Sequence, residues 1–143
     1  MTVVAIHLAA EHGAPVVPVA SAQAYAGKGI EGDRHFFPDG DAHAGEALTL
    51  VEDEVVGDVG LPPGATRRQV TVRGVRLNLL IGRRFRVGAV ECLGVEICEP
   101  CLTLERNTRP GIVKDLVHRG GINADILSDG TISVGDELTT LER

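Results

Sequence analysis

The sequence predicts a mainly β fold with helical insertions (α+β), a β-barrel formed by one domain over residues 1–143. The chain is 43% apolar but only 3% aromatic, so aliphatic side chains must fill its core, and β-branched residues favour strands. Its 18 glycines and seven prolines indicate many tight turns. Several segments alternate polar and apolar residues, and strands and helices do not follow one another in a regular βαβ succession.

The first half of the chain predicts three strands, a long loop and a helix. Residues 2–9 and 15–22 form two strands joined around Gly13. Residues 25–46 show no periodicity, and an unstructured segment of this length in a compact domain indicates a functional or a disordered loop. Residues 47–60 begin as a strand and continue as a helix, which Gly60 and two prolines end.

The second half predicts further strands, one helix and a hairpin. Residues 67–74, 84–88 and 89–100 alternate polar and apolar side chains. In the last of these the apolar positions change from even to odd at Gly94, which predicts a bulge or a sharp bend. Residues 111–121 predict a helix, and residues 122–138 predict a hairpin of two strands turning at Asp129–Gly130.

The overall charge limits the partners of the protein. A formal net charge of −6 argues against nucleic-acid binding through a broad basic surface. The N-terminus has neither the basic start of a signal peptide nor a membrane span, and three cysteines without an export signal fit a reducing cytoplasm. We therefore expect a cytoplasmic protein without nucleic-acid or membrane partners. Seven arginines lie between Arg67 and Arg86; composition alone favours a solvated edge over an anion pocket there.

The motif "CEPC", Cys98 to Cys101, is compatible with three kinds of chemistry. A structural zinc site needs about four ligands, yet the chain has no second C-x-x-C and no histidine at ligand spacing. A redox dithiol needs a thioredoxin-like setting that the chain lacks. Pro100 can begin a helix, which places Cys101 in a first turn where backbone amides lower the pKa of a thiol. A single functional thiol at Cys101 remains, and Cys92 is interpreted as a core residue.

The segment "GIEGDRHF", residues 29–36, is a second candidate. Its glycines allow close approach of the backbone to a ligand, and Arg34 and His35 offer adjacent hydrogen-bond donors. The alternative interpretation is a turn with a surface ion pair between Asp33 and Arg34.

The segment "RRQVTVRG", residues 67–74, is a third candidate. Arginines at the two ends of its predicted strand, Arg67 and Arg68 at the start and Arg73 at the end, can reach a phosphate or an anionic cofactor. The alternative is that they only keep a sheet edge soluble.

Taken together, these segments resemble the MOSC domain, named after the C-terminal domain of molybdenum cofactor sulfurase. "GIEGDRH" is similar to the family's early glycine–aspartate loop, "RRQVTVRGVRLNLLIGRRFRVG" to its arginine-led strand, and "INADILSDGTISVGDEL" to its closing hairpin. "EPCLTLE" resembles the segment with the family's cysteine, which maps onto Cys101. The arginine of the family maps onto Arg67, and Gln69 replaces its usual asparagine.

The resemblance implies a β-barrel and a cysteine that carries sulfur or coordinates molybdenum held by a pterin. The implied cofactor-binding residues are Arg34, Arg67, Gln69 and Arg73. The family is also associated with pyridoxal phosphate, but this chain lacks the pyridoxal-dependent sulfurase domain and the N-terminal extension of larger members. We therefore expect a stand-alone bacterial-type member.

Three functions follow as hypotheses. The preferred one is a protein that binds molybdenum cofactor (molybdopterin), with Cys101 as metal ligand and His35 as proton donor, and reduces small N-hydroxylated compounds. The second is a sulfur carrier with a persulfide on Cys101, which takes sulfur from a donor protein for cofactor sulfuration or metal–sulfur cluster assembly. The third is a binding module without chemistry.

Overall fold

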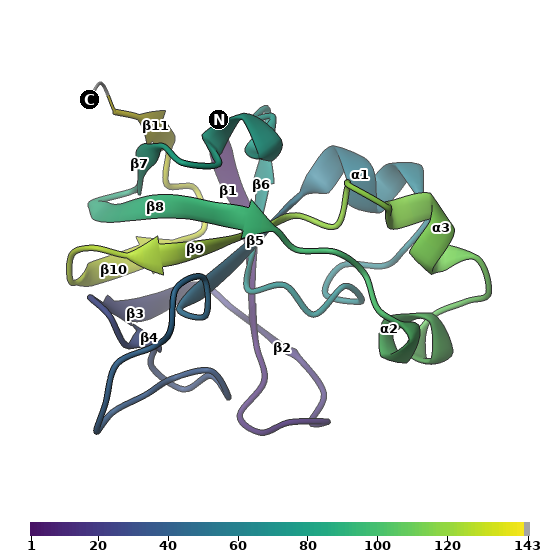
Figure 1. The fold of residues 1–143 in the computed structure, drawn as a ribbon, viewed down its shortest axis with the longest axis horizontal. Helices are drawn as coiled ribbons and strands as arrows, with labels where there is room; N and C mark the ends of the chain where they lie inside the picture. The colour runs from purple at the N-terminus through teal and green to yellow at the C-terminus, as the bar shows by residue number, and fades with distance from the viewer. Residues whose placement is uncertain (142–143) are drawn as a thin grey trace.

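A computed structural model describes residues 1–141 of the chain (Figure 1). These residues form eleven strands, three short α-helices and one 3-10 turn. The strands are β1 (Thr2–Leu8), β2 (Val17–Val19), β3 (Ser21–Tyr25), β4 (Gly29–Ile30), β5 (Leu48–Glu52), β6 (Val70–Arg73), β7 (Arg84–Val87), β8 (Val90–Ile97), β9 (Ile122–Ile126), β10 (Gly130–Ser133) and β11 (Leu138–Thr140). The helices are α1 (Asp53–Asp58), α2 (Leu102–Asn107) and α3 (Ile112–Leu116), and the 3-10 turn is η1 (Leu77–Leu80).

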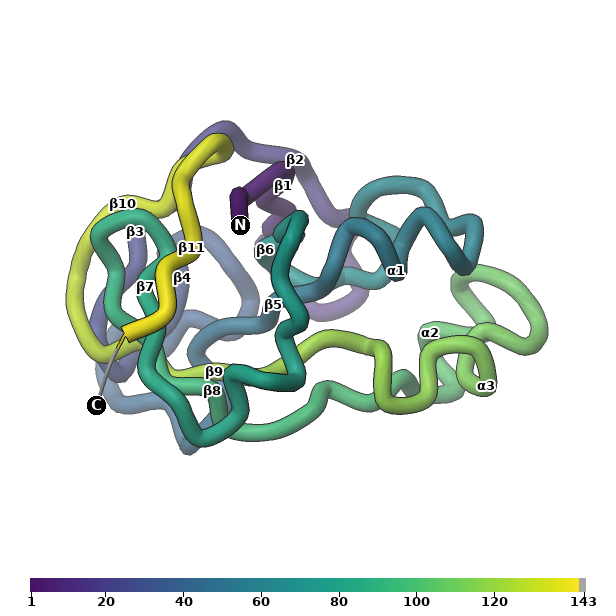
Figure 2. The backbone as a smooth tube through the Cα atoms, turned by 90° about the horizontal axis from the view of Figure 1, so that it is seen from above, coloured from purple at the N-terminus to yellow at the C-terminus, as the bar shows by residue number. Residues whose placement is uncertain are grey.

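Most strands belong to one curled sheet of eight strands. Its order is β11-β7-β8-β9-β5-β6-β1-β2, and only β5 and β6 pair in parallel. The sheet curls until the beginning of β1 meets the segment before β11, where the amide of Val3 donates to Asp136 O at 2.8 Å. A smaller sheet, β10-β3-β4, lies beside it (Figure 2). The mainly β, barrel-like architecture predicted from the sequence is confirmed.

The core inside the curled sheet is aliphatic, as the composition predicts. Ile6, Leu50, Leu77 and Ile122 are no more than 1% exposed, and Phe85 is the one aromatic residue among the largest fully buried side chains. Along β9 buried residues alternate with half-buried ones, so a single face supplies the core. Burial of each such side chain contributes roughly 1.5–3 kcal/mol.

The three helices gather at one end of the molecule and share a second, smaller apolar cluster (Figure 1). Leu104 of α2 and Ile112 and Leu116 of α3 pack with Val55 and Val59 of the α1 region. Each helix has only five or six residues, so this cluster rather than helix propensity holds them in place. Among residues 1–141, no helix is long and apolar enough to cross a membrane.

The bulge predicted at Gly94 is confirmed. The register between β8 and β9 shifts between Gly94 and Glu96. A Cβ atom at Gly94 would lie 2.1 Å from the carbonyl oxygen of Leu80, so only glycine fits where β8 passes over the 3-10 turn.

The hairpin predicted for residues 122–138 is wrong in its pairing. Both strands form, but β9 pairs with β8 and β5 whereas β10 pairs with β3 in the smaller sheet. Because β8 and β5 occupy both edges of β9, β10 has no free edge of β9 to pair with. After the turn at Asp129–Gly130 the chain therefore enters the smaller sheet. The helix predicted for residues 111–121 is also shorter than expected, because the residues after Leu116 leave helical geometry and His118 adopts a φ of 60°.

Candidate functional site

Asp33 lies in the "GDRH" segment, residues 32–35, and is the centre of a buried hydrogen-bond network. Its side chain is 0% exposed. Oδ1 accepts the amide of Ala9 at 3.0 Å, and Oδ2 accepts the amide of His35 at 3.2 Å and Nε2 of Gln69 at 2.8 Å. The ion pair with Arg34, predicted at the surface in one interpretation, is instead buried, with Nη1 at 3.5 Å from Oδ1. A buried carboxylate with this many donors holds its surroundings in one arrangement.

Gln69 belongs to this network and not to the surface. It is 2% exposed. While its Nε2 donates to Asp33, its Oε1 accepts the amide of Thr49 at 2.8 Å. The side chain joins β5 to the "GDRH" segment, and both ends of its amide already have protein partners.

Arg34 extends from the buried network towards Arg67. The Arg34 side chain is 12% exposed, and its Nη2 donates to the carbonyl oxygen of Arg67 at 3.4 Å. Burial lowers the pKa of Arg34, Asp33 opposes that change, and the charges of Arg67 and Arg68 lower the pKa further. The guanidinium remains protonated at any physiological pH, so three positive charges gather here.

Arg67 combines two costly features. The sequence places it at the start of a strand, but it lies in the turn before β6 with a φ of 60°, the left-handed region that favours glycine. Its Nη2 is buried without a hydrogen-bond partner among the described residues. A buried unpaired guanidinium nitrogen on a strained backbone costs stability on both counts, which makes Arg67 a candidate donor for a ligand.

The thiol loop, residues 98–101, leaves the end of β8 and leads into α2. The amide of Cys98 donates to Gly121 O at 2.8 Å, which fixes the start of the loop on the beginning of β9. Cys98 is half-buried, whereas Cys101 is exposed. The sequence predicts a helix that begins at Pro100 and has Cys101 in its first turn. The helix instead begins at Leu102, because Cys101 is still extended (φ −125°, ψ 169°) and is the N-cap.

The two thiols of this loop differ in acidity. Interaction with the backbone amide of Leu104 lowers the pKa of Cys101, although its Sγ makes no capping hydrogen bond. Burial raises the pKa of Cys98, against the opposing charge of Arg68. Cys101 therefore has more thiolate at neutral pH and is open to solvent, as a nucleophile or a metal ligand requires. Cys92 is 0% exposed and burial raises its pKa to about 12, which fits its interpretation as a core residue.

His35 lies next to Arg34 and stacks edge-on against His12, with the ring centroids 5.3 Å apart. Burial lowers the pKa of His35, and the charge of Arg34 lowers it further. At neutral pH the ring is therefore uncharged, and it offers an N–H hydrogen bond rather than a readily released proton.

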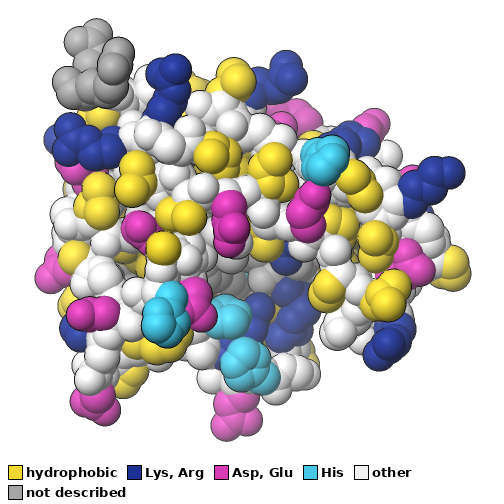
Figure 3. Space-filling model, viewed as in Figure 1, with side chains coloured by type: hydrophobic (Ala, Val, Ile, Leu, Met, Phe, Trp, Pro, Cys, Tyr) yellow, Lys and Arg dark blue, Asp and Glu magenta, His cyan; other side chains and the backbone are white. Residues whose placement is uncertain are grey.

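These side chains are joined by contacts between separate segments: Arg34 reaches the turn that carries Arg67, and Arg68 of that turn reaches the thiol loop. The charge of Arg68 also contributes to lowering the pKa of Cys101. Figure 3 shows a hollow between the strands and the helices with basic and histidine side chains beside it, and we take this hollow as the candidate site. We call Asp33, Arg34, His35, Arg67, Arg68, Cys98 and Cys101 the site group.

Arg73 is not part of the site group. It lies at the opposite end of β6 from Arg67, and Nη2 of its exposed side chain contacts Asp53 Oδ2 at 2.8 Å. Five residues separate the two arginines, and the six steps from one to the other span about 20 Å in an extended chain. The structure therefore separates two arginines that the sequence assigns to one ligand.

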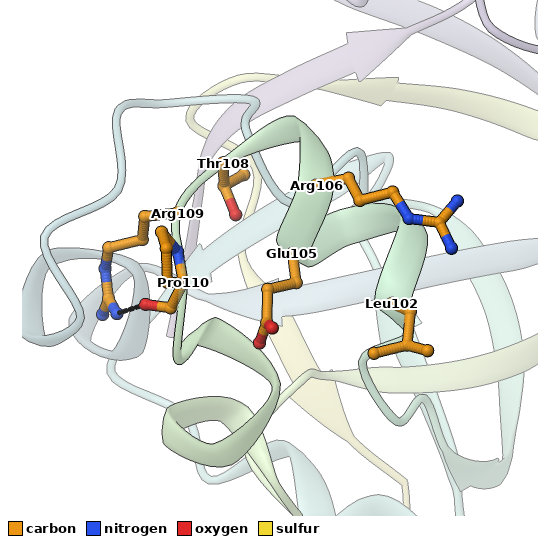
Figure 4. A pocket seen from close by; sticks show the side chains of 6 residues that line it. All are labelled: Leu102, Glu105, Arg106, Thr108, Arg109 and Pro110. Carbon is orange, nitrogen blue, oxygen red and sulfur yellow. Dashed lines mark hydrogen bonds between the residues drawn. The ribbon is translucent and has the colours of Figure 1, made fainter.

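A second depression, of about 370 Å³, lies on the outer side of α2 and includes none of the site group. It is lined by Leu102, Glu105, Arg106, Thr108, Arg109 and Pro110 (Figure 4). Glu105 lies between Leu102 and Arg109 in this view, but its carboxylate already accepts the amide of Val113, and Arg109 pairs with Asp115 at 2.7 Å. Two of the three charged groups that line this depression, Glu105 and Arg109, already have protein partners. The third, Arg106, is exposed, so we place the candidate site at the hollow.

The comparisons with known proteins decide the family. A family model described as the MOSC domain matches residues 40–139. The chain belongs to the MOSC domain family.

The solved structures similar to this MOSC protein share its fold. The YuaD protein of Bacillus subtilis superposes with a TM-score of 0.77 at 21% identity, covering 98% of this chain and 96% of that one. YiiM of Geobacillus stearothermophilus gives 0.74 at 18% identity, covering 99% and 75%. YiiM of Escherichia coli gives 0.68 at 16% identity, covering 100% and 71%. No curated protein matches the sequence of this chain.

The donor set of the MOSC site offers few metal ligands. Within residues 1–141, no three His, Cys, Asp or Glu side chains are grouped so that they could hold a metal ion. A metal within an organic, anionic cofactor needs only one protein ligand. The exposed Cys101 is the candidate for that ligand, and the unpartnered Arg67 nitrogen is the candidate donor to an anionic group.

Sequence reasoning places Arg68 beside Arg67 at a strand start, but it does not predict that Arg68 contacts the thiol loop. It misses His12, which it treats only as a residue that interrupts the apolar N-terminus. The sequence holds no signal for His12, since its contact with His35 joins two separate loops.

Proposed function

We propose that this MOSC protein binds molybdenum cofactor at the hollow, with Cys101 as the protein ligand to the metal, and that the loaded protein reduces small N-hydroxylated compounds. The observation that carries the proposal is the buried, unpartnered Nη2 of Arg67. It lies beside the buried Arg34 and on a strained backbone. An anionic group would satisfy this nitrogen and offset the cost of holding it there.

Each residue has a stated part in this function. Arg67 and Arg34 bind anionic groups of the cofactor. The attraction between opposite charges is stronger in a recess than in bulk water. The exposed thiolate of Cys101, at the N-cap of α2, is the ligand to the metal. His35 offers an N–H donor to a substrate oxygen, and Asp33 fixes the backbone of His35. When bound, a molybdenum centre supplies the capacity to accept an oxygen atom from a substrate.

Gln69 and Arg73 are not assigned to the cofactor in this proposal. Gln69 has protein partners at both ends of its amide, and Arg73 pairs with Asp53 away from the hollow. Pyridoxal phosphate is also left out, because the site group contains no lysine of the kind that binds it.

Metal and pterin analysis tests the proposal. Protein purified from a host that makes molybdenum cofactor should contain molybdenum and pterin in near-equal amounts. Cys101→Ser should lose the metal, whereas Cys98→Ser should keep it. If wild type and Cys101→Ser both lack molybdenum, the cofactor hypothesis fails.

A sulfur carrier is the second candidate, favoured by the exposure of Cys101 together with its lowered pKa. A donor protein can reach such a thiol more readily than one inside a pocket. Sulfur released by cyanide from wild type but not from Cys101→Ser, in protein without molybdenum, supports this function. Full rescue of a deletion strain by Cys101→Ala would instead favour a passive binding module.

A further inference from the structure

Arg68 makes a set of contacts that no other residue of the site group makes. Its Nε donates to Gly120 O at 2.8 Å, its Nη1 to Thr66 O at 3.3 Å and its Nη2 to Cys98 O at 3.3 Å. These carbonyls belong to three separate segments: the segment before β9, the turn that carries Arg67, and the thiol loop. One planar guanidinium thus ties both halves of the site to the sheet.

Close backbone packing at Gly120 brings the thiol loop within reach of Arg68. A Cβ atom at Gly120 would lie 2.3 Å from Cys98 O, and 3.4 Å from both Arg68 Nη2 and Pro100 Cδ. The glycine allows the thiol loop to lie directly against the backbone before β9, where Arg68 reaches both carbonyls. The loop has two further contacts. Glu99 accepts the amide of His118 at 2.7 Å, and the amide of Cys98 donates to Gly121 O at 2.8 Å. Neither of these contacts reaches the turn that carries Arg67, whereas Arg68 belongs to that turn and contacts the loop.

We infer that Arg68 is a positioning residue: it fixes the thiol loop and the Arg67 turn relative to one another, and does not itself bind the ligand. The inference rests on the proposed function only in taking Cys101 as the working thiol. The rigid fork of an arginine can serve three carbonyls at once, whereas the single ammonium of a lysine cannot. The geometry of the guanidinium, not only its charge, is therefore required.

Alkylation of the three cysteines, measured separately by mass spectrometry at one fixed pH, tests this inference without any cofactor. In wild type, Cys101 should react first, Cys98 slowly and Cys92 hardly at all. Arg68→Gln should raise the alkylation rate of Cys98 about tenfold. Loss of one charge-assisted hydrogen bond shifts the equilibrium between the attached and the detached loop by about that factor. Cys92 should stay protected, because it lies in the barrel core and reports global unfolding.

Two variants separate geometry from charge. Arg68→Lys keeps the charge and should behave like Arg68→Gln. Gly120→Ala keeps the arginine but displaces the loop, and should also expose Cys98. The matched control is Arg106→Gln, an exposed arginine on α2 for which no hydrogen bond or ion pair is seen within residues 1–141; it should leave all three rates unchanged.

Three results would overturn the inference: an unchanged Cys98 rate in Arg68→Gln, a Cys92 rate that rises in step with that of Cys98, or wild-type rates in Arg68→Lys. Molybdenum retention adds a second readout, which Arg68→Gln should lower more than Arg106→Gln. If wild type holds no molybdenum, the proposed function fails while the alkylation result still decides the role of Arg68.

Discussion

The two halves of the site are built in opposite ways. The half formed by the "GDRH" segment and the start of β6 rests on Asp33, a buried carboxylate that accepts hydrogen bonds from Ala9, His35 and Gln69. The thiol loop has an exposed Cys101 and is attached to the rest of the molecule through Arg68, the amide of Cys98 and the close packing of Gly120. The arginine half is thus built on a buried network, whereas the thiol half presents its reactive group to solvent.

This difference suits a site that must both bind an anion and present a reactive thiol. A fixed set of positive groups binds an anion without reorganisation, and an exposed thiolate can reach a metal or a sulfur donor. Substitutions in the first half should therefore change stability strongly, and those in the second half mainly reactivity.

The largest effect is expected for Asp33→Ala. The substitution leaves Arg34 and the Gln69 amide buried without their acceptor, which costs about 3–5 kcal/mol in the free energy of unfolding. Denaturation by urea measures it. Asp39→Ala, at an exposed carboxylate a few residues after the "GDRH" segment, should change the free energy of unfolding by less than about 0.5 kcal/mol. Equal effects of the two variants would contradict a first half built on a buried network.

A glycine comparison measures how tightly the Arg67 turn is packed. Gly64 has a φ of +83°, and a Cβ atom there would lie 2.8 Å from the ring of His7. Gly64→Ala should cost about 2–4 kcal/mol through backbone strain and overpacking. Gly13→Ala has a similar φ of +79° but open space around it, and should cost only about 1 kcal/mol. A similar loss for both, measured by urea denaturation, would mean that the turn is not packed as described.

Arg67→Gly should change stability and binding in opposite directions. Glycine relieves the left-handed strain and removes the unpaired nitrogen, so the free energy of unfolding should rise by about 1 kcal/mol. Molybdenum retention should fall, because the anion donor is lost. A variant that loses stability and keeps the metal would show that Arg67 is a structural residue.

The smallest effect concerns the pH dependence of stability. Burial lowers the pKa of His7 below its ordinary 6.5, so on acidification the unfolded state binds a proton before the folded state does. Stability from this group is therefore complete above the ordinary pKa and is lost as the pH falls below it. His7→Phe keeps a ring under Gly64 and should make stability less dependent on pH between about 7 and 5. An unchanged slope in thermal unfolding would contradict this role.

The sequence predicts local features of this fold better than its long-range pairing. The strand that becomes a helix at Asp53 and the bulge at Gly94 follow from local patterns, and both are found. The partner of β10 is β3, more than 100 residues earlier in the chain, and alternation alone cannot select among strands with the same pattern.

The same limit applies to the site. Arg34, His35, Arg67 and Cys101 were singled out by residue type, and contacts between their segments bring them to one region. Arg73 has the same chemistry as Arg67 but lies at the other end of its strand, and Arg68 became distinct from its neighbours only through three carbonyls that the fold brings together.

The central claim is that Arg67 and Cys101 hold one ligand between them. Alkylation of Cys101 in protein that contains molybdenum tests it most directly. In wild type, the fraction of Cys101 protected from alkylation should equal the molybdenum content, and Arg67→Gln should lower both together. Full reactivity of Cys101 in molybdenum-containing protein would place the metal elsewhere and contradict this account.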